Sequence, residues 1–248
     1  PDAERYDLSS LRLCTGGGES LTADTFHRWR ERFGMEIHEG FGTTEMMYVF
    51  ISNAVAREAR PGSIGWPVPG YEIQVVDEQG ESLPPGEPGR LIVRGPTGTL
   101  YWRDVDRQRT VVRDGWNVVG DYMRRDDDGY VWFVSREDDL IKSSGYRIGP
   151  EEVEQALVKH PAVLDAAVVG VPDPIRGQNA KAFVVLRPDS VASEELKEDI
   201  LRFLRSEIAV YKLPRLVDFV DELPRSPTGK LLRRVLRERE ASPSAPAS

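Results

Sequence analysis

The stretch SREDDLIKSSGYRIGPEEVE occupies residues 135–154 and separates two parts of the chain that differ in character. It mixes acids and bases, passes a Ser-Gly turn and then enters a helix signal, because Pro150 suits the first helical position and the glutamates after it favour the helix dipole. Such a segment fits a charged hinge between two lobes, and it fits solvated linker charges equally well. We place the domain boundary here, between residues 1–137 and residues 138–240.

Upstream of this stretch, one strand–helix–strand unit is followed by strands punctuated with Gly and Pro. The first pattern is typical of an α/β unit, and the second of a small antiparallel sheet or barrel. Thr22 is a suitable N-cap for the helix. The expected elements are a strand at 11–14, a helix at 22–33, and strands at 35–38, 71–76, 90–93 and 130–134.

Downstream of it, helices alternate with short strands, which predicts a compact α+β domain. Ser193 is a second N-cap signal, and the small, Pro-rich residues 241–248 are typical of a disordered tail. The fold class predicted for the whole chain is therefore α/β plus α+β. The expected elements are helices from Pro150 to about 160, from Ser193 and at 230–240, and strands at 163–171, 180–186 and 216–220.

Composition excludes several classes of function. The 248 residues hold 33 Lys and Arg against 41 Asp and Glu, so the net charge of −8 argues against a nucleic-acid binder. Cys14 is the single cysteine, which fits a reducing, cytoplasmic location, and no apolar run is long enough to span a bilayer. The sequence opens in mid-pattern without Met, so we read it as a piece of a longer protein.

The segment EGFGTTE (residues 39–45) brings hydroxyls and a carboxylate together in a glycine-flanked turn. Thr43 and Thr44 can donate to a phosphate, Glu45 offers a hard oxygen to Mg²⁺, and the glycines permit close backbone approach. An ordinary loop entering a buried strand accounts for the same residues. This stretch alone does not choose between the two interpretations.

Two further loops each present one charged side chain. Asp121 follows a Gly turn in WNVVGD, and a carboxylate can accept hydrogen bonds from ribose hydroxyls. Lys230 ends the Pro-restrained loop LPRSPTGK at the start of a predicted helix, and an ammonium suits a phosphate or carboxylate. A solvated aspartate and a solvated lysine are the alternatives. The loop is not a Walker motif, because the earlier glycines are missing.

Other chemistries find no support. The three histidines are scattered without metal-ligand spacing, and no nucleophile elbow or Cys/His pair occurs. Four arginines near the end of the chain fit a solvated helix face better than a nucleic-acid surface; they are Arg233, Arg234, Arg237 and Arg239.

Taken in order, the motifs resemble one family. GGGES, EGFGTTE, GSIGWPVPG, GEPGRL, WNVVGD, SREDDLIKSSGYRIGPEEVE and LPRSPTGKLLRR are similar to those of the acyl-adenylate-forming superfamily, which holds acyl- and aryl-CoA synthetases, non-ribosomal peptide adenylation domains and luciferases. TTEMMYVFISN and RGPTGTLYW further resemble benzoate- and aminobenzoate-CoA ligases. The resemblance covers nearly the whole chain. It implies the end of a large AMP-binding domain, with an α/β layer and a small β-barrel, followed by a small mobile α+β lid.

This resemblance implies an activity. The expected enzyme is an ATP-dependent carboxylic acid–CoA ligase that forms an acyl-adenylate, for an aromatic acid such as benzoate or aminobenzoate. Its cofactors and partners would be ATP/AMP, Mg²⁺, coenzyme A and the small carboxylic acid, without nucleic acid or a membrane span; a homodimer is compatible with it. The family's phosphate loop lies upstream of these motifs, so we expect this piece to be inactive alone. A carrier-protein adenylation domain and a non-catalytic nucleotide-binding fragment are the alternatives.

The resemblance also implies roles for single residues. Lys230, Thr43 and Glu45 would be catalytic, with Glu45 the Mg²⁺ ligand, and Asp138 would be the hinge. Ser135 and Val119 depart from the usual Gly and Thr of the family. The residues expected to bind nucleotide or CoA are Gly18, Glu19, Glu39 and Phe41 beside the adenine, Gly42 and Thr44 at the phosphates, Asp121 and Arg136 at the ribose, and Gly145 and Arg147 in the CoA-facing loop.

Overall fold

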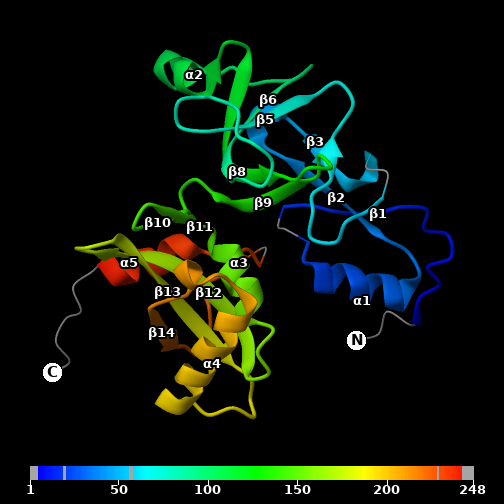
Figure 1. The fold of residues 1–248 in the computed structure, drawn as a ribbon. Helices are drawn as coiled ribbons and strands as arrows, with labels where there is room; N and C mark the ends of the chain where they lie inside the picture. Colours follow the sequence, from blue (N-terminus) through cyan, green and yellow to red (C-terminus); the bar gives the residue numbers. More distant parts are fainter. Residues whose placement is uncertain (1–4, 19–20, 56–57, 228, 242–248) are drawn as a thin grey trace. The chain divides into compact units, whose positions relative to one another are not determined.

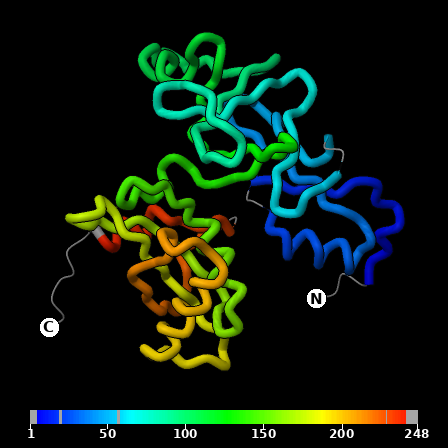
Figure 2. The backbone as a smooth tube through the Cα atoms, in the orientation of Figure 1, coloured from blue at the N-terminus to red at the C-terminus, as the bar shows by residue number. Residues whose placement is uncertain are grey.

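The computed structural model describes residues 5–18, 21–55, 58–227 and 229–241 (Figures 1 and 2). Contacts divide the chain into unit 1, Pro1–Phe133, and unit 2, Val134–Ser248. The domain boundary that we expect after residue 137 stays a prediction. No helix within the described ranges is long and apolar enough to cross a membrane.

Unit 1 begins with a four-stranded sheet in the order β1-β2-β3-β4. Strands β1 and β2 are parallel and joined by helix α1, whereas β3 is antiparallel to β2 and β4 to β3. The bounds are β1 Cys14–Gly16, α1 Ala23–Phe33, β2 Ile37–Gly42, β3 Val49–Ser52 and β4 Trp66–Pro67.

Helix α1 confirms its predicted N-cap. The Thr22 hydroxyl accepts a hydrogen bond from the Thr25 backbone N–H at 3.2 Å, and Gly34 ends the helix in a left-handed conformation with φ of 67°. The strands around α1 were wrongly bounded. The first starts only at Cys14, and the second runs on to Gly42, because pairing with β1 and β3 on both sides outweighs the turn preference of its glycines.

The second sheet of unit 1 is antiparallel along the order β5-β6-β8-β7, and β9 also pairs with β8. The strands expected near 71–76, 90–93 and 130–134 are present as β5, β6 and β9. Strands β7 and β8 and helix α2 were missed. The bounds are β5 Glu72–Val76, β6 Gly89–Arg94, α2 Val105–Val111, β7 Val112–Arg113, β8 Trp116–Arg125 and β9 Val131–Arg136.

The two sheets of unit 1 share one apolar core. Phe50 and Ile51 of β3 are fully buried in the same cluster as Leu91 of β6 and Met123 of β8. These contacts fix the loop that follows β2 against the second sheet, because Met46 of that loop belongs to the cluster too.

Unit 2 is built on one sheet with the order β11-β10-β13-β12, and β14 runs parallel to β13 (Figure 1). Strands β12 and β13 form a long antiparallel hairpin from Val163↔Leu186 to Asp173↔Gly177. The bounds are β10 Ile141–Ser143, β11 Tyr146–Ile148, α3 Pro150–Leu157, β12 Val163–Asp173, β13 Gly177–Leu186, α4 Glu194–Glu207, β14 Leu216–Phe219 and α5 Arg233–Ala241.

Both faces of this sheet are covered, which explains why β12 reads as a continuous apolar run. Ala166 and Val168 belong to the cluster that contains residues of α3 and α4. The alternate residues Ala167 and Val169 belong to a second cluster with Leu236 of α5. Helix α5 therefore covers the face opposite to α3 and α4.

The helix ends of unit 2 follow the predicted caps only in part. Pro150 opens α3 and the Ser193 hydroxyl caps α4, as predicted. Helix α3 stops at Leu157, however, and α5 starts at Arg233, so Lys230 lies in a loop and not on a helix. Ala241, predicted in the tail, is the last residue of α5, and residues 242–248 lie outside the described ranges.

Leu204 tests the core of unit 2, because its side chain is 0% exposed between α4 and the sheet. We expect Leu204→Ala to lower the free energy of unfolding by about 2–5 kcal/mol. Leu164→Ala removes the same atoms from a residue that is 51% exposed, and it should change the free energy of unfolding by only about 0.5 kcal/mol. Urea unfolding of both variants measures the difference, and equal effects would contradict the assigned core.

Candidate functional site

Two glycine-rich segments meet at the carboxyl edge of β1 and β2. Gly16 pairs with Glu39, and a Cβ on Gly17 would lie 3.1 Å from the Gly40 carbonyl oxygen. Gly18 follows β1 with φ of 92°, in the left-handed region that favours glycine. The carboxyl edge of parallel strands is the usual binding edge of α/β sheets. Glu19, expected beside the adenine, lies outside the described residues.

The chain doubles back immediately after β2, around Thr43. A Cβ on Gly42 would lie 2.3 Å from the Tyr48 carbonyl oxygen, so only glycine fits there. Thr44–Met46 form a 3-10 turn, and Thr43, which precedes it, does not use its side chain to cap the turn. Within the described part of the chain, the buried Thr43 hydroxyl finds no hydrogen-bond partner. Such an orphan is costly, so it fits a site where a ligand oxygen completes the bonding.

Glu45 is held in this turn by a residue far along the chain. The Tyr101 hydroxyl donates to Glu45 Oε1 at 3.1 Å, and desolvation together with this bond raises the pKa of Tyr101. No cluster of three or more His, Cys, Asp or Glu ligands occurs among the described residues. One carboxylate beside an unpaired hydroxyl still fits Mg²⁺, which takes its other ligands from phosphates and water. Tyr101 belongs to the segment RGPTGTLYW, but nothing in the spacing of the sequence connects it with Glu45.

Glu39 is a buried carboxyl group on β2, with 6% of its surface exposed. Its Oε1 accepts the backbone N–H of Leu21 at 3.0 Å. Burial raises the pKa of Glu39 to about 7, against the lowering effect of that hydrogen bond. Glu39 therefore joins the loop after β1 to β2 instead of facing open solvent.

The apolar residues after the turn divide into two groups. Phe50 and Ile51 are fully buried core, as expected for this run, and Phe41 packs edge-on against Phe50 with ring centroids 5.4 Å apart. Met47 and Tyr48 are 74% and 77% exposed, and Met47 has a φ of 66°. These two side chains are thus the apolar ones of this run that are available to a ligand.

Asp121 lies within a strand, so its predicted place after a turn is corrected. Strand β8 carries an irregularity opposite Arg90 and Ile92, and Gly120 sits there with φ of 75°. A bulge of this kind re-aims the side chains next to it. Asp121 lies next to the bulge, and only 7% of its surface is exposed.

In unit 2, Lys230 lies exposed in a closed loop. Ser226 N–H donates to the Lys230 carbonyl at 2.8 Å, Lys230 N–H donates to the Ser226 hydroxyl at 3.1 Å, and Leu232 N–H donates to the Pro224 carbonyl at 2.8 Å. Arg225 pins the loop to β12 by donating to Asp165 at 2.7 Å, and it also donates to the Gly229 carbonyl. These hydrogen bonds join the described parts of the loop to each other and to β12, and Lys230 itself is exposed.

Gly145 occupies the turn of the β10–β11 hairpin. Ser144 and Gly145 have φ values of 50° and 85° between the paired Ser143 and Tyr146, the pattern of a type I′ turn. Ser143 also pairs with Gly177, at the end of the β12–β13 hairpin far from Asp165. The Gly145 turn and the anchor of the Lys230 loop are thus associated with opposite ends of one hairpin. Arg147 lies on β11.

The predicted hinge falls in a short turn after β9. Arg136 is exposed at the end of β9, and Asp138 is exposed in the following turn, which closes when Leu140 N–H donates to the Arg136 carbonyl at 3.0 Å. These positions are compatible with a pivot, and the hinge role stays a prediction.

The arginines of α5 do not form one solvated face, which corrects the prediction. The Arg234 side chain is 79% exposed, but those of Arg233 and Arg237 are only 13% and 30% exposed. Arg233 binds Glu154, which we expected to act only on the helix dipole, and Arg237 binds Asp139, which we expected to be a charge of the hinge or a solvated linker.

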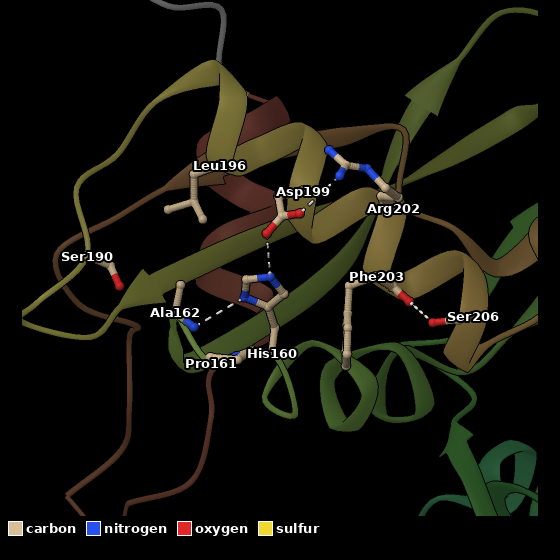
Figure 3. Close-up of a pocket in the computed structure, with 9 residues that line it drawn as sticks. All are labelled: His160, Pro161, Ala162, Ser190, Leu196, Asp199, Arg202, Phe203 and Ser206. Atoms are coloured by element: carbon tan, nitrogen blue, oxygen red, sulfur yellow. Dashed lines mark hydrogen bonds and ion pairs between the residues drawn. The ribbon is translucent and has the colours of Figure 1, made fainter.

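A pocket in unit 2 lies between the turn after α3, the loop at Ser190 and helix α4 (Figure 3). His160, 6% exposed, sits within hydrogen-bond distance of Asp199 through Nε2 and accepts the Ala162 N–H through Nδ1, each at 3.2 Å. Both ring nitrogens are therefore engaged in joining α4 to the turn. None of the predicted site residues lines this pocket.

Two separate parts of the chain match family models of AMP-binding enzymes. Residues 1–102 match the AMP-binding enzyme family, and residues 152–230 match the AMP-binding enzyme C-terminal domain. The chain belongs to the AMP-binding enzymes.

Relatives of this AMP-binding enzyme include CoA ligases of more than one kind. Mitochondrial acyl-coenzyme A synthetase ACSM3 of Mus musculus is 41% identical over 96% of this chain and 42% of its own. The anthranilate CoA ligase AuaEII, solved with anthranoyl-AMP, is 41% identical with a TM-score of 0.84, over 96% of this chain and 46% of its own. A benzoate CoA ligase from Burkholderia xenovorans LB400 is 40% identical with a TM-score of 0.81, over 92% and 46%.

These comparisons confirm the predicted fold class and the resemblance to adenylate-forming enzymes. The chain spans less than half the length of these relatives. The name of the mouse relative places that protein in mitochondria, so the cytoplasmic location expected for this AMP-binding enzyme stays a prediction.

Gly42 tests the backbone of the Thr43 turn. We expect Gly42→Ala to lower the free energy of unfolding by about 1–3 kcal/mol, because its Cβ would overlap the Tyr48 carbonyl and force the turn open. Gly98→Ala is the matched control, since its Cβ would meet only ordinary contacts from 3.5 Å. Thermal unfolding compares the two, and a harmless Gly42→Ala would refute the close approach.

Glu39 gives the stability of the protein a pH dependence. Its folded-state pKa of about 7 exceeds the reference value of 4.5, so the stabilisation is complete below pH 4.5 and is lost as pH rises to 7. We expect the free energy of unfolding of wild type, relative to Glu39→Gln, to fall by on the order of 3 kcal/mol across that window. Urea titrations at several pH values measure it, and parallel curves for the two proteins would contradict the raised pKa.

Proposed function

We propose that the full-length protein is an ATP-dependent carboxylic acid–CoA ligase that works through an acyl-adenylate, with an aromatic acid as its substrate. Membership of the AMP-binding enzymes supports the adenylate, and the CoA ligases among its relatives support the thiol acceptor. The observation that carries the proposal is the buried Thr43 hydroxyl, two residues before Glu45 and just after β2, which has no hydrogen-bond partner among the described residues.

The nucleotide would bind mainly to unit 1. Gly18, whose Cβ position is open, would let the nucleotide approach the backbone closely. Gly42 allows the chain to turn back on Tyr48, and the hydroxyls of Thr43 and Thr44 would donate to phosphate oxygens. Glu45, oriented by Tyr101, would hold Mg²⁺, which supplies positive charge against the phosphates. Asp121 would accept hydrogen bonds from the ribose, with Arg136 as its partner in that role.

The first half-reaction joins the acid to AMP. A carboxylate oxygen of the acid attacks the α-phosphorus of ATP, the bond to the β-phosphate oxygen breaks, and pyrophosphate leaves with the electron pair. The Lys230 ammonium would offset the negative charge that gathers between the two anions in this step. The hydrogen bonds of the described loop residues suit this role, because a positioned charge needs little reorganisation when the reaction occurs.

The second half-reaction transfers the acyl group to coenzyme A. The thiolate attacks the acyl carbon, the bond to the AMP oxygen breaks, and AMP leaves. Neither step needs a nucleophile from the protein. A rotation about Asp138 would exchange the Lys230 loop for the Gly145 turn, which are associated with opposite ends of the β12–β13 hairpin. Gly145 and Arg147 would then face the CoA.

An aromatic acid is the finer part of the proposal. The exposed side chains of Met47 and Tyr48 follow the turn that contains Thr43 and Thr44, and they offer apolar surface suited to a flat ring. Anthranilate and benzoate ligases among the solved relatives support this choice. The acyl-CoA synthetase ACSM3 is equally similar in sequence, so a pyrophosphate-release screen must include aliphatic acids beside benzoate and aminobenzoate.

Lys230→Ala separates the two half-reactions in the full-length protein. We expect formation of the acyl-adenylate to fall by about 100-fold or more, because the charge in the first transition state is lost. Formation of thioester from supplied acyl-adenylate and CoA should change by less than about 3-fold. Pyrophosphate release and thioester absorbance measure the two steps.

The matched control is Lys159→Ala, which removes an ammonium that is 62% exposed and pairs with Glu207 on the surface. It should leave both half-reactions unchanged. An equal loss of both half-reactions in Lys230→Ala would refute the role given to Lys230.

A further inference from the structure

Four charged side chains gather at the edge of the unit 2 sheet. Arg233 donates from Nε to Glu154 at 3.0 Å and from Nη2 to the second oxygen of the same carboxylate at 2.5 Å. Asp139 accepts from Arg233 at 3.5 Å and from Arg237. The side chains of Asp139, Glu154 and Arg233 are only 12–14% exposed. Burial works against the charge of Arg233, but the bonds to Glu154 outweigh it and raise its pKa.

This cluster wraps around the edge of the sheet. Strand β12 is the edge strand, and its Val168 N–H donates to Glu154 at 2.7 Å. Glu154 belongs to α3 on one face of the sheet, and Arg233 belongs to α5 on the other. The bidentate pair therefore fixes the two helices to each other and to the backbone of β12.

The cluster also holds the turn that contains Asp138. Asp139 follows Asp138 directly, and two arginines of α5 bind its carboxylate. Asp139 must then move with α5. Any rotation of unit 2 about this turn has to use backbone torsions on the N-terminal side of Asp139, which is where Asp138 lies.

Arg233 is, in addition, the residue that ends the Lys230 loop. The N-terminal leg of that loop is pinned by Arg225 on Asp165, and its two legs are joined where Leu232 donates to Pro224. The next residue is Arg233. The second leg is therefore anchored through the Arg233 guanidinium, at the same cluster that holds Asp139.

We infer that Arg233 is a positioning residue for Lys230: with Glu154 and Asp139 it makes the hinge turn, the sheet edge and the Lys230 loop one rigid body. This inference rests on the proposed function of Lys230. A rotation at Asp138 then carries the ammonium to a defined place. Buried ion pairs are a poor source of net stability but impose a defined geometry, and the planar guanidinium does so through two bonds that a lysine cannot make.

The test compares variants of the full-length protein. Arg233→Met removes the link but leaves Glu154 as a buried unpaired charge, so its folding is at risk. The double variant Arg233→Met/Glu154→Gln removes both charges and keeps an acceptor for the Val168 N–H, which makes it the decisive protein. Arg233→Lys retains the charge without the bidentate contact. Arg234→Met is the matched control on the exposed side of the same helix.

Three quantities are measured: the rate of pyrophosphate release, the rate of thioester formation from supplied acyl-adenylate, and amide hydrogen exchange of residues 225–232. For the double variant we expect Tm within about 3 °C of wild type. Adenylation should fall by about 10- to 100-fold, thioester formation by less than about 3-fold, and exchange in 225–232 should quicken. Arg233→Lys should be intermediate, and Arg234→Met should match wild type.

The inference is overturned if the folded double variant adenylates at the wild-type rate with unchanged exchange in 225–232. It is also overturned if both half-reactions and Tm fall together, since that pattern marks a purely structural role. If wild type releases no pyrophosphate with any acid, the proposed function fails by itself. The exchange comparison between Arg233 and Arg234 variants still decides whether Arg233 holds the loop.

Discussion

Two hydrogen bonds between the Arg233 guanidinium and the Glu154 carboxylate join helix α5 to helix α3 in unit 2. Apolar burial on both faces of β12 supplies the driving force for packing, but the hydrophobic effect is non-directional. The ion pair adds direction, because its geometry is satisfied in one arrangement of α3, α5 and the strand edge. Removing one partner alone would leave a buried unpaired charge, which is strongly destabilising.

Unit 1 depends on a different constraint, the close approach of bare backbone. Gly17 lies against the Gly40 carbonyl and Gly42 against the Tyr48 carbonyl, so the loops after β1 and β2 reach one edge. Among the described residues, the Thr43 hydroxyl in the turn after β2 is buried without a hydrogen-bond partner. A buried hydroxyl without a partner lowers the stability of the fold, and it favours binding of a ligand that completes its hydrogen bond.

Local signals in the sequence were sufficient for the starts of α1, α3 and α4, but they missed α2 and placed the start of α5 too early. Thr22, Pro150 and Ser193 open their helices as predicted, since capping depends on neighbours within one turn. Strand β8 was missed because Gly120 interrupts its pattern at a bulge, and EGFG was taken for a turn because pairing with strands on both sides cannot be read from its glycines. In each case the deciding hydrogen bonds come from distant residues.

The motifs along the chain are enough to identify the family, the order of its two parts and the kinds of group at the site: hydroxyls and a carboxylate after β2, and a lysine in a Pro-restrained loop. Which arginine near that lysine is buried follows only from the fold. Arg233 and Arg234 are the same amino acid side by side, yet one is buried on Glu154 and the other is solvated. It also supplied Tyr101 as the partner of Glu45. The reason is physical: burial and pairing are set by contacts between segments far apart in the chain, and residue spacing carries no record of them.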